Sequence, residues 1–275
     1  MTDQGDPLAR IAEALERLAP PPAAEADWLA HPAYVWDGAA ARGIAQIEAP
    51  ELAQLCGIDA QKEKVSANVM RHAQGHAAHD MLLWGARGMG KSALVRSATI
   101  AAQRELPASL ALVQAGSDAL SGLPRLFDRL GMVERRFLVY IDDLGFADTD
   151  SETPRRLRSW LEGGVEARPA NVRLAVTSNR RAIQSRHLSE QDDPINPRDA
   201  TDDRLALADR FGISVGFHNC DKPTYLAIIA TYAQAAGLAW EEGDAMEWAA
   251  RRGARSGRTA WQYVTELAGR AGKML

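Results

Sequence analysis

Short apolar runs alternate with amphipathic stretches through the middle of the chain. The apolar runs have the length of β-strands, and they cover residues 81–86, 109–115, 137–142, 172–178 and 213–217. Helix-length stretches separate the first four runs, at residues 91–104, 118–131 and 153–166. Strands that are apolar throughout are typical of a parallel sheet with helices on both faces, and the alternation implies right-handed crossovers. The pattern therefore predicts an α/β fold, a three-layer αβα core with a five-stranded parallel sheet.

The pattern becomes purely helical in the last part of the chain. From Pro223 onward, helical stretches follow one another at about residues 223–236, 241–252 and 256–271. We expect them to form a small all-α domain beside the sheet. Its large aromatic side chains are interpreted as the core of that domain, and they are Trp240, Trp248 and Trp261.

The N-terminal part of the chain is organised differently. Residues 7–19 predict one amphipathic helix, whose apolar stripe consists of Leu8, Ile11, Leu15 and Leu18. Pro20 ends that helix, and its stripe either packs on its own domain or mediates self-association or partner binding. The chain then divides into a helix with a proline-rich tether (1–22), an irregular segment (23–49), the α/β core (50–220) and the helical domain (221–275).

Composition excludes several classes of protein. The chain is 46% hydrophobic and 25% charged, as in a soluble globular protein. A net charge of −4 and a pI near 5.9 argue against a broad basic surface for nucleic acid. Cys56 and Cys220 lie too far apart in sequence to suggest a thiolate metal site. Without a signal peptide or a membrane-spanning apolar run, the protein is expected in the cytoplasm, away from membranes.

A glycine-rich motif joins the first strand to the helix after it. The motif reads Gly85, Ala86, Arg87, Gly88, Met89, Gly90, Lys91 and Ser92. Glycines let successive backbone N–H groups face one anion, and the helix N-terminus adds partial positive charge. Lys91 can then reach the terminal phosphates, and the Ser92 hydroxyl can ligate Mg²⁺. Strand, loop and helix together predict a site for a nucleoside triphosphate, taken as ATP with Mg²⁺.

Polar residues follow two other strands of the predicted sheet. Asp142 and Asp143 come directly after residues 137–141, and Asn179 follows residues 174–178. We assign Asp142 to Mg²⁺, which it would hold through the water shell of the ion. Asp143 is assigned to polarising the attacking water, and Asn179 to orienting that water beside the γ-phosphate.

Arginines supply the remaining candidates for catalysis. Arg210 precedes the last strand and is predicted to act as a finger on the nucleotide of another subunit, with Arg204 as the alternative. Arg258 opens the last helix, and we prefer it over Arg255 as the arginine that reaches the phosphates from the helical domain. An arginine in such a position neutralises charge that develops during phosphoryl transfer.

These motifs in this order resemble an AAA+ P-loop ATPase over roughly residues 50–272. The resemblance implies a five-stranded core with a helical lid, nucleotide between them, and homo-oligomers with active sites at subunit interfaces. It also implies that Gly57 and Ile58 line the adenine pocket. The pairing of Asp142-Asp143 with Asn179 is similar to the DnaA, DnaC and IstB group, in which two aspartates support hydrolysis.

A closer resemblance is to the bacterial domain-of-unknown-function family 815. Three segments carry it, at residues 83–88, 161–169 and 255–258. We therefore expect an oligomeric Mg·ATPase that remodels or loads a macromolecular client, with protein slightly favoured over nucleic acid. The alternative is a nucleotide-gated assembly switch or scaffold with little turnover. A monomeric small-molecule kinase is disfavoured because no acceptor site is visible.

Overall fold

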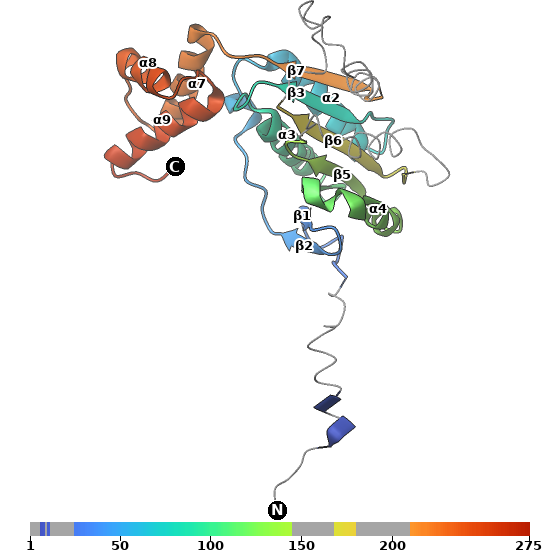
Figure 1. Ribbon diagram of the computed structural model, residues 1–275. Coiled ribbons are helices and arrows are strands. Elements are labelled where there is room, and N and C mark those ends of the chain that lie inside the picture. The colour runs from blue at the N-terminus through green and yellow to red at the C-terminus, as the bar shows by residue number, and fades with distance from the viewer. Residues whose placement is uncertain (1–5, 9, 12–24, 145–167, 180–209) are drawn as a thin grey trace, which may run out of the picture.

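The computed structural model describes residues 6–8, 10–11, 25–144, 168–179 and 210–275 of the chain (Figure 1). The described part contains one mixed sheet in the order β2-β1-β4-β5-β6-β3-β7. The strands span Ala33–Trp36 (β1), Ala41–Ile44 (β2), Met81–Gly85 (β3), Leu110–Ala115 (β4), Arg136–Ile141 (β5), Val172–Ser178 (β6) and Ile213–Phe217 (β7). All neighbouring pairs are parallel except β1 with β2. The five predicted strands are all present.

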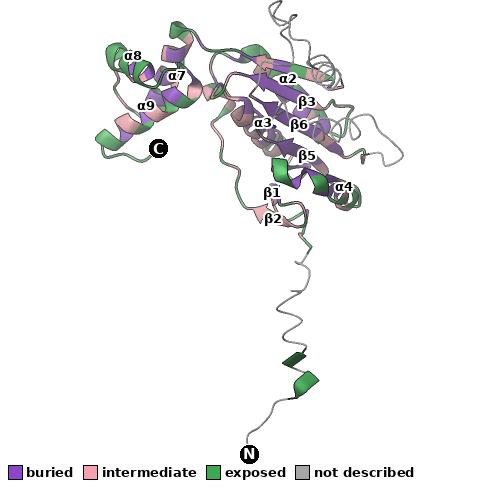
Figure 2. Ribbon diagram, in the orientation of Figure 1, coloured by how far each residue is buried: buried purple, intermediate pink, exposed green. Residues whose placement is uncertain are grey.

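Helices cover both faces of this sheet, as the apolar strands require. The α-helices of the core span Asp59–Ala73 (α2), Lys91–Glu105 (α3) and Leu123–Gly131 (α4), and short 3-10 turns span Leu52–Gln54 (η1) and Ser117–Gly122 (η2). Alternate strand residues belong to different buried clusters: Leu138 and Tyr140 join the cluster with α2 and α3, whereas Val139 and Ile141 join the cluster with α4. The purple strands between these layers in Figure 2 show how completely both faces are buried.

The sheet is larger than the sequence pattern predicts, with seven strands in place of five. The additional strands β1 and β2 lie in the 23–49 segment, which was expected to be irregular, and this expectation is wrong. Each strand is only four residues long, and β1 contributes side chains to both buried clusters. The β1 sequence therefore lacks the alternation of polar and apolar residues that would indicate a strand. Trp28, Tyr34 and Trp36 are buried in the same cluster as α4.

The last helices form a separate lid beside the sheet (Figure 1). They span Lys222–Ala235 (α7), Glu242–Arg251 (α8) and Gly257–Arg270 (α9), close to the predicted ranges. Side chains at the N-termini fix where α7 and α9 begin, because Asp221 accepts a hydrogen bond from the Thr224 N–H and Ser256 one from the Thr259 N–H. None of the described helices is long and apolar enough to cross a bilayer.

Two predicted helices fall wholly or largely outside the described residues. The stretch 153–166 is one of them. Of residues 7–19, the structure describes only four, all helical, and among these Leu8 and Ile11 are exposed. Within residues 50–75, η1 and α2 are separated by a break at residues 55–58.

Candidate nucleotide-binding site

Three polar segments meet at one edge of the sheet because of the strand order. In that order β5 lies beside β6 and β6 lies beside β3. All three strands are parallel, so their carboxyl ends share an edge. The glycine-rich loop, the acidic pair 142–143 and Asn179 therefore come together, although about 90 residues separate Lys91 from Asn179 in sequence.

The glycine-rich loop curls directly into the first turn of α3. Gly90 precedes the helix and has a φ of 89°. This left-handed conformation is unfavourable for residues that have a side chain, so glycine is suited to it. The first N–H groups of α3 have no earlier carbonyls within the helix to bind, apart from the bond of Leu94 N–H to Gly90 O. This end of α3 is therefore suited to an anion.

The side chain of Lys91 is held at the centre of the loop and is only 5% exposed. Its ammonium donates to Gly85 O at 2.9 Å, to Ala86 O at 2.8 Å and to Asn179 Oδ1 at 2.9 Å. Burial lowers the pKa of Lys91 to about 8, despite the opposing charges of Asp143 and Asp142. The environment thus disfavours the positive charge until an anion arrives.

Asp142 lies where a cation would be held. Its Oδ1 accepts hydrogen bonds from Ser92 Oγ and Thr177 Oγ1, both at 2.7 Å. Burial raises the pKa of Asp142, but the hydroxyl groups around its carboxylate outweigh burial and hold the pKa below its usual value. An ionised carboxylate beside a serine hydroxyl is a hard oxygen donor set, so these residues fit Mg²⁺.

Asp143 and Asn179 form the other polar contact of the site. Asn179 Nδ2 donates to Asp143 Oδ1, while Asn179 Oδ1 accepts from Lys91. Since an ammonium only donates and a carboxylate only accepts, both ends of the amide are fixed. Asp143 has a φ of 49°, a left-handed conformation that aspartate tolerates better than most residues. This explains why aspartate is suited to the position.

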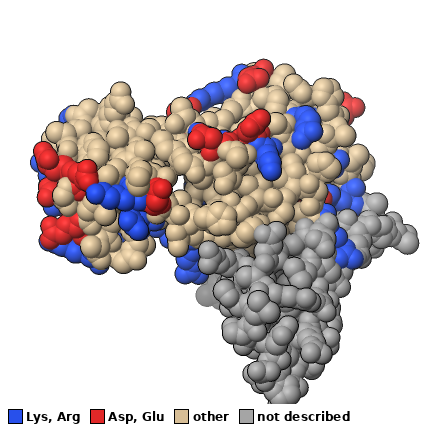
Figure 3. All heavy atoms as spheres, turned by 90° about the horizontal axis from the view of Figure 1, so that it is seen from above, with Lys and Arg blue, Asp and Glu red and all other residues tan. Residues whose placement is uncertain are grey.

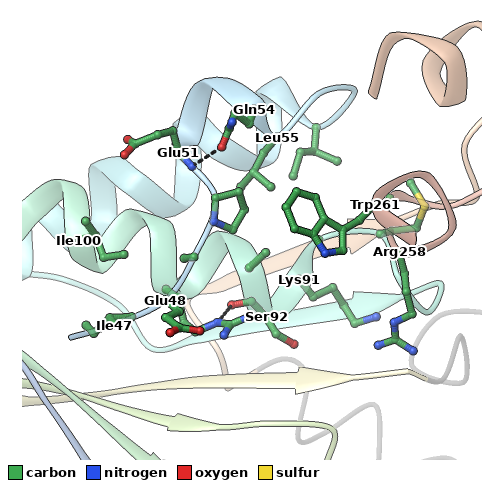
Figure 4. A pocket seen from close by; sticks show the side chains of 18 of the residues that line it. Ile47, Glu48, Glu51, Gln54, Leu55, Lys91, Ser92, Ile100, Arg258 and Trp261 are labelled. Atoms are coloured by element: carbon green, nitrogen blue, oxygen red, sulfur yellow. Dashed lines mark hydrogen bonds between the residues drawn. The ribbon is translucent and has the colours of Figure 1, made fainter. Parts of the chain in front are cut away.

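The lid closes the site from the opposite side. The backbone N–H of Arg258 donates to Gly88 O at 3.0 Å, which joins the first turn of α9 to the loop. The Arg258 side chain points toward Lys91 (Figure 4), and its charge contributes to lowering the pKa of Lys91. Arg258 thus lines the cavity from the lid side, whereas Arg255 does not line it.

Between core and lid lies a cavity of about 1060 Å³. Its loop side is lined by residues 88–92, with Asp142, Asp143, Thr177 and Asn179 nearby. Its apolar side includes Leu55, Cys56, Ile58, Ile228, Tyr232 and Trp261. Of the two residues expected at the adenine pocket, Ile58 lines this cavity and Gly57 does not. It has a φ of 74°, and a Cβ there would lie 2.3 Å from Thr224 Cγ2, so it permits close packing of α7.

Four other expected site residues do not line the cavity. Gly85, Ala86 and Arg87 do not line it, although the carbonyls of Gly85 and Ala86 hold Lys91. Arg210 lies just before β7, which is in register with β3 from Met81↔Ile213 to Gly85↔Phe217. It is therefore at the end of the strands opposite the loop. Arg204 is outside the described residues.

Thr177 and Trp261 line the cavity but were not among the site residues expected from sequence. Thr177 lies opposite Asp142 because Ile141 pairs with Val176, and a polar side chain directly after the apolar run of residues 174–176 was the available signal. Trp261 was expected in the lid core, but it is 44% exposed and lines the cavity. Its position became evident only once α9 was placed against the loop.

Comparison with known proteins gives a family and a fold. The model of a protein family of unknown function, DUF815, matches residues 29–271. Similar solved structures include a RuvB variant from Thermotoga maritima, with a TM-score of 0.54, 19% identity, and 83% of this chain and 68% of that chain covered. Another is Orc1 from Aeropyrum pernix in complex with DNA, with a TM-score of 0.56 and 14% identity. The match covers 80% of this chain and 65% of the Orc1 chain.

No curated protein sequence matches this chain with significance. The family match nevertheless covers residues 29–271, well over half of the chain, and each of the two solved structures aligns with 80% or more of it. The chain therefore belongs to the DUF815 family and has the fold of the AAA+ P-loop ATPases.

Proposed function

We propose that this protein is a Mg²⁺-dependent ATPase whose active site is completed by a second copy of the chain. The observation that carries the proposal is the hydrogen-bonded chain from Lys91 through Asn179 to Asp143, next to the Ser92–Asp142 pair. These contacts bring a phosphate-binding cation, a water-orienting amide and two carboxylates to one cavity between core and lid.

Each group has a distinct task in hydrolysis. The N–H groups of the loop and of the first turn of α3 bind the phosphate oxygens. Ser92 and Asp142 hold Mg²⁺, which supplies charge neutralisation for the phosphates when bound. Asp143 accepts a proton from the attacking water at its carboxylate, while the Asn179 amide orients that water. Arg258 neutralises charge on the γ-phosphate from the lid side.

Arg210 is proposed to serve the site of a neighbouring subunit. The strand β7 runs between Arg210 and the loop edge, and at about 3.3 Å per residue its five residues separate the two by roughly 16 Å. An arginine at that distance does not reach its own phosphates. A homo-oligomer in which this end of one core faces the cavity of the next would bring the guanidinium to the γ-phosphate.

Hydrolysis is proposed to remodel or load a macromolecular client in the cytoplasm. The RuvB from Thermotoga maritima is described as a Holliday junction branch migration motor, and the Orc1 structure contains DNA. In this chain, charges of both signs are interspersed on the face shown in Figure 3, and the net charge is −4. A surface of this kind favours a protein client over a nucleic acid.

The test is calorimetric Mg·ATP binding together with phosphate release, for the wild type, Lys91→Ala and Asp143→Asn. We expect the wild type to bind and hydrolyse ATP and Lys91→Ala to lose binding. Asp143→Asn should bind ATP and release phosphate at least 100-fold more slowly, because an amide cannot take the proton. Asparagine also tolerates the left-handed backbone of this position.

Unchanged ATP affinity in Lys91→Ala would contradict the assignment of the phosphate site. ATP binding by the wild type with negligible turnover at every protein concentration would contradict hydrolysis and favour a nucleotide-gated switch.

A further inference from the structure

Trp261 lines the cavity, although the reaction proposed above gives it no task. It lies in α9 three residues after Arg258, and residues at this spacing project from the same side of a helix. Arg258 points toward Lys91, so Trp261 follows it along the same wall of the cavity (Figure 4). A tryptophan that served only the lid core would be buried, yet this one is 44% exposed.

The neighbours of Trp261 leave part of its indole uncovered. Tyr232 of α7 is buried and makes a T-shaped contact with it, with ring centroids 5.1 Å apart and an interplanar angle of 75°. In a T-shaped pair the partner occupies at most one face of the ring. At least one face of the indole is therefore free of Tyr232, beside the space that Ile228 also lines.

This apolar part of the cavity begins directly at the phosphate loop. A Cβ placed on Gly90 would lie 3.5 Å from Ile58 Cδ1 and 3.9 Å from Leu55 Cδ2, both in ordinary contact. On the other side, the first turn of α9 is bonded to Gly88. A ligand whose phosphates occupy the loop would thus place whatever is attached to them between Leu55 and Ile58 on one side and the lid on the other.

We propose that the indole of Trp261 stacks on the base of the bound nucleotide and so couples occupancy of the cavity to the position of the lid. This inference rests on the proposed ATP site and adds the group that recognises the base. A flat aromatic ring between apolar side chains suits a planar heterocycle, and such stacking is sequence-tolerant because every base has a π-face. The base, rather than the phosphates, is therefore the part of the ligand that Trp261 recognises.

Comparing ATP with inorganic tripolyphosphate, which has no base, tests this assignment. Binding of each is measured by calorimetry with Mg²⁺ for the wild type and Trp261→Ala. Removing the ring should weaken ATP binding roughly 10- to 100-fold, because base–aromatic stacking has that magnitude. Tripolyphosphate affinity should stay within about twofold, since the loop and Lys91 are intact.

Tryptophan fluorescence gives a second readout that does not depend on a large loss of affinity. Stacking on a base should change the emission of wild-type protein when ATP binds, and Trp261→Phe should remove that change. The matched control is Trp240→Phe, a lid tryptophan that does not line the cavity, and it should retain the change.

Different outcomes separate this inference from the function on which it rests. Equal affinities of Trp261→Ala and wild type for ATP would overturn the stacking. An equal loss for ATP and tripolyphosphate would overturn it too, because the effect would not involve the base. If wild-type protein bound neither ligand, the nucleotide site itself would be wrong.

Discussion

The hydroxyl of Thr177 connects the two aspartates that follow β5. It donates to Asp142 Oδ1 at 2.7 Å and accepts from the Asp143 N–H at 2.8 Å, so both its donor and an acceptor position are used. The same side chain thus orients the carboxylate assigned to Mg²⁺ and fixes the left-handed backbone of the next residue. The sequence shows both aspartates, but only the register of β5 with β6 reveals which residue lies between them.

His72 bonds to the amino end of β5, the end opposite the site, and it makes the fold sensitive to acid. It is 2% exposed, and its Nε2 lies 3.1 Å from Phe137 O, so the neutral ring donates to that carbonyl. Burial lowers the pKa of His72 to about 4, whereas in the unfolded chain it keeps an ordinary pKa near 6.5. Between pH 4 and pH 6.5 the unfolded chain binds a proton on His72 that the folded chain does not bind. The free energy of unfolding therefore falls as the pH drops from 6.5 toward 4.

We therefore expect His72→Gln to lose less stability than the wild type when the pH is lowered. In urea unfolding, the free energy of unfolding of the wild type should fall by up to about 3 kcal/mol more than that of His72→Gln when the pH is lowered from about 7 to about 4. His76→Gln is the control, because this histidine of the following turn is exposed. Parallel profiles for His72→Gln and the wild type would show that His72 is not the buried group that protonates on unfolding.

At the scale of elements, the loop and the lid helix α9 act as one unit. Gly88 has a φ of 72°, and a Cβ there would lie 2.9 Å from both Arg258 Cβ and Ser256 Oγ. Both contacts are to the first turn of α9, which also bonds to the Gly88 carbonyl. A side chain at this position would therefore push α9 and Arg258 away from the phosphates.

Gly88→Ala is expected to weaken ATP binding about tenfold or more, because it would remove the contact of Arg258 with the phosphates. One charge-assisted hydrogen bond contributes about this much to binding. Gly253→Ala is a matched control, since Gly253 has a similar φ of 67° but a Cβ there meets nothing within 4 Å. Each variant should lose about 1–2 kcal/mol of stability from the left-handed backbone. Titration of both with Mg·ATP checks the prediction, which fails if Gly253→Ala loses as much affinity as Gly88→Ala.

The core elements that the sequence predicts well are those with a strong local signal. The five strands of the parallel core are mostly apolar, and α3 follows a glycine motif that has few other uses. β1 was missed because its stability comes from pairing with β4, nearly 80 residues later, rather than from its own four residues. The site followed the same rule: Lys91, Asp142 and Asn179 stand in recognisable motifs, whereas Trp261 enters the cavity through packing of the lid.

Arg135 shows how the added strands are held at the sheet edge. This buried guanidinium donates to the carbonyls of Trp28, His31 and Leu110. Burial lowers the pKa of Arg135, and the hydroxyl of Tyr34 lies close enough to oppose that effect. The segment that leads into β1 is thereby fastened to β4, which extends the sheet on the side away from β7.

At the scale of the whole molecule, the two ends of the sheet carry different parts of the proposed machinery. The carboxyl ends of β3, β5 and β6 carry the cavity, and Arg210 lies at the amino end of β7. The lid adds Arg258 and Trp261 to the cavity from one side. A single chain therefore holds both halves of the proposed machinery without bringing them together, and assembly of subunits is the step that would.

The measurement that tests this account most directly is ATP turnover in a mixture of two inactive variants. Arg210→Ala keeps its nucleotide site but lacks the arginine, and Asp143→Asn binds ATP but supplies an intact Arg210. We predict that each alone is inactive, and that the mixture hydrolyses ATP with a rate per subunit that rises with protein concentration. A mixture as inactive as its components, beside a wild type whose turnover per subunit is independent of concentration, would contradict an active site shared between subunits.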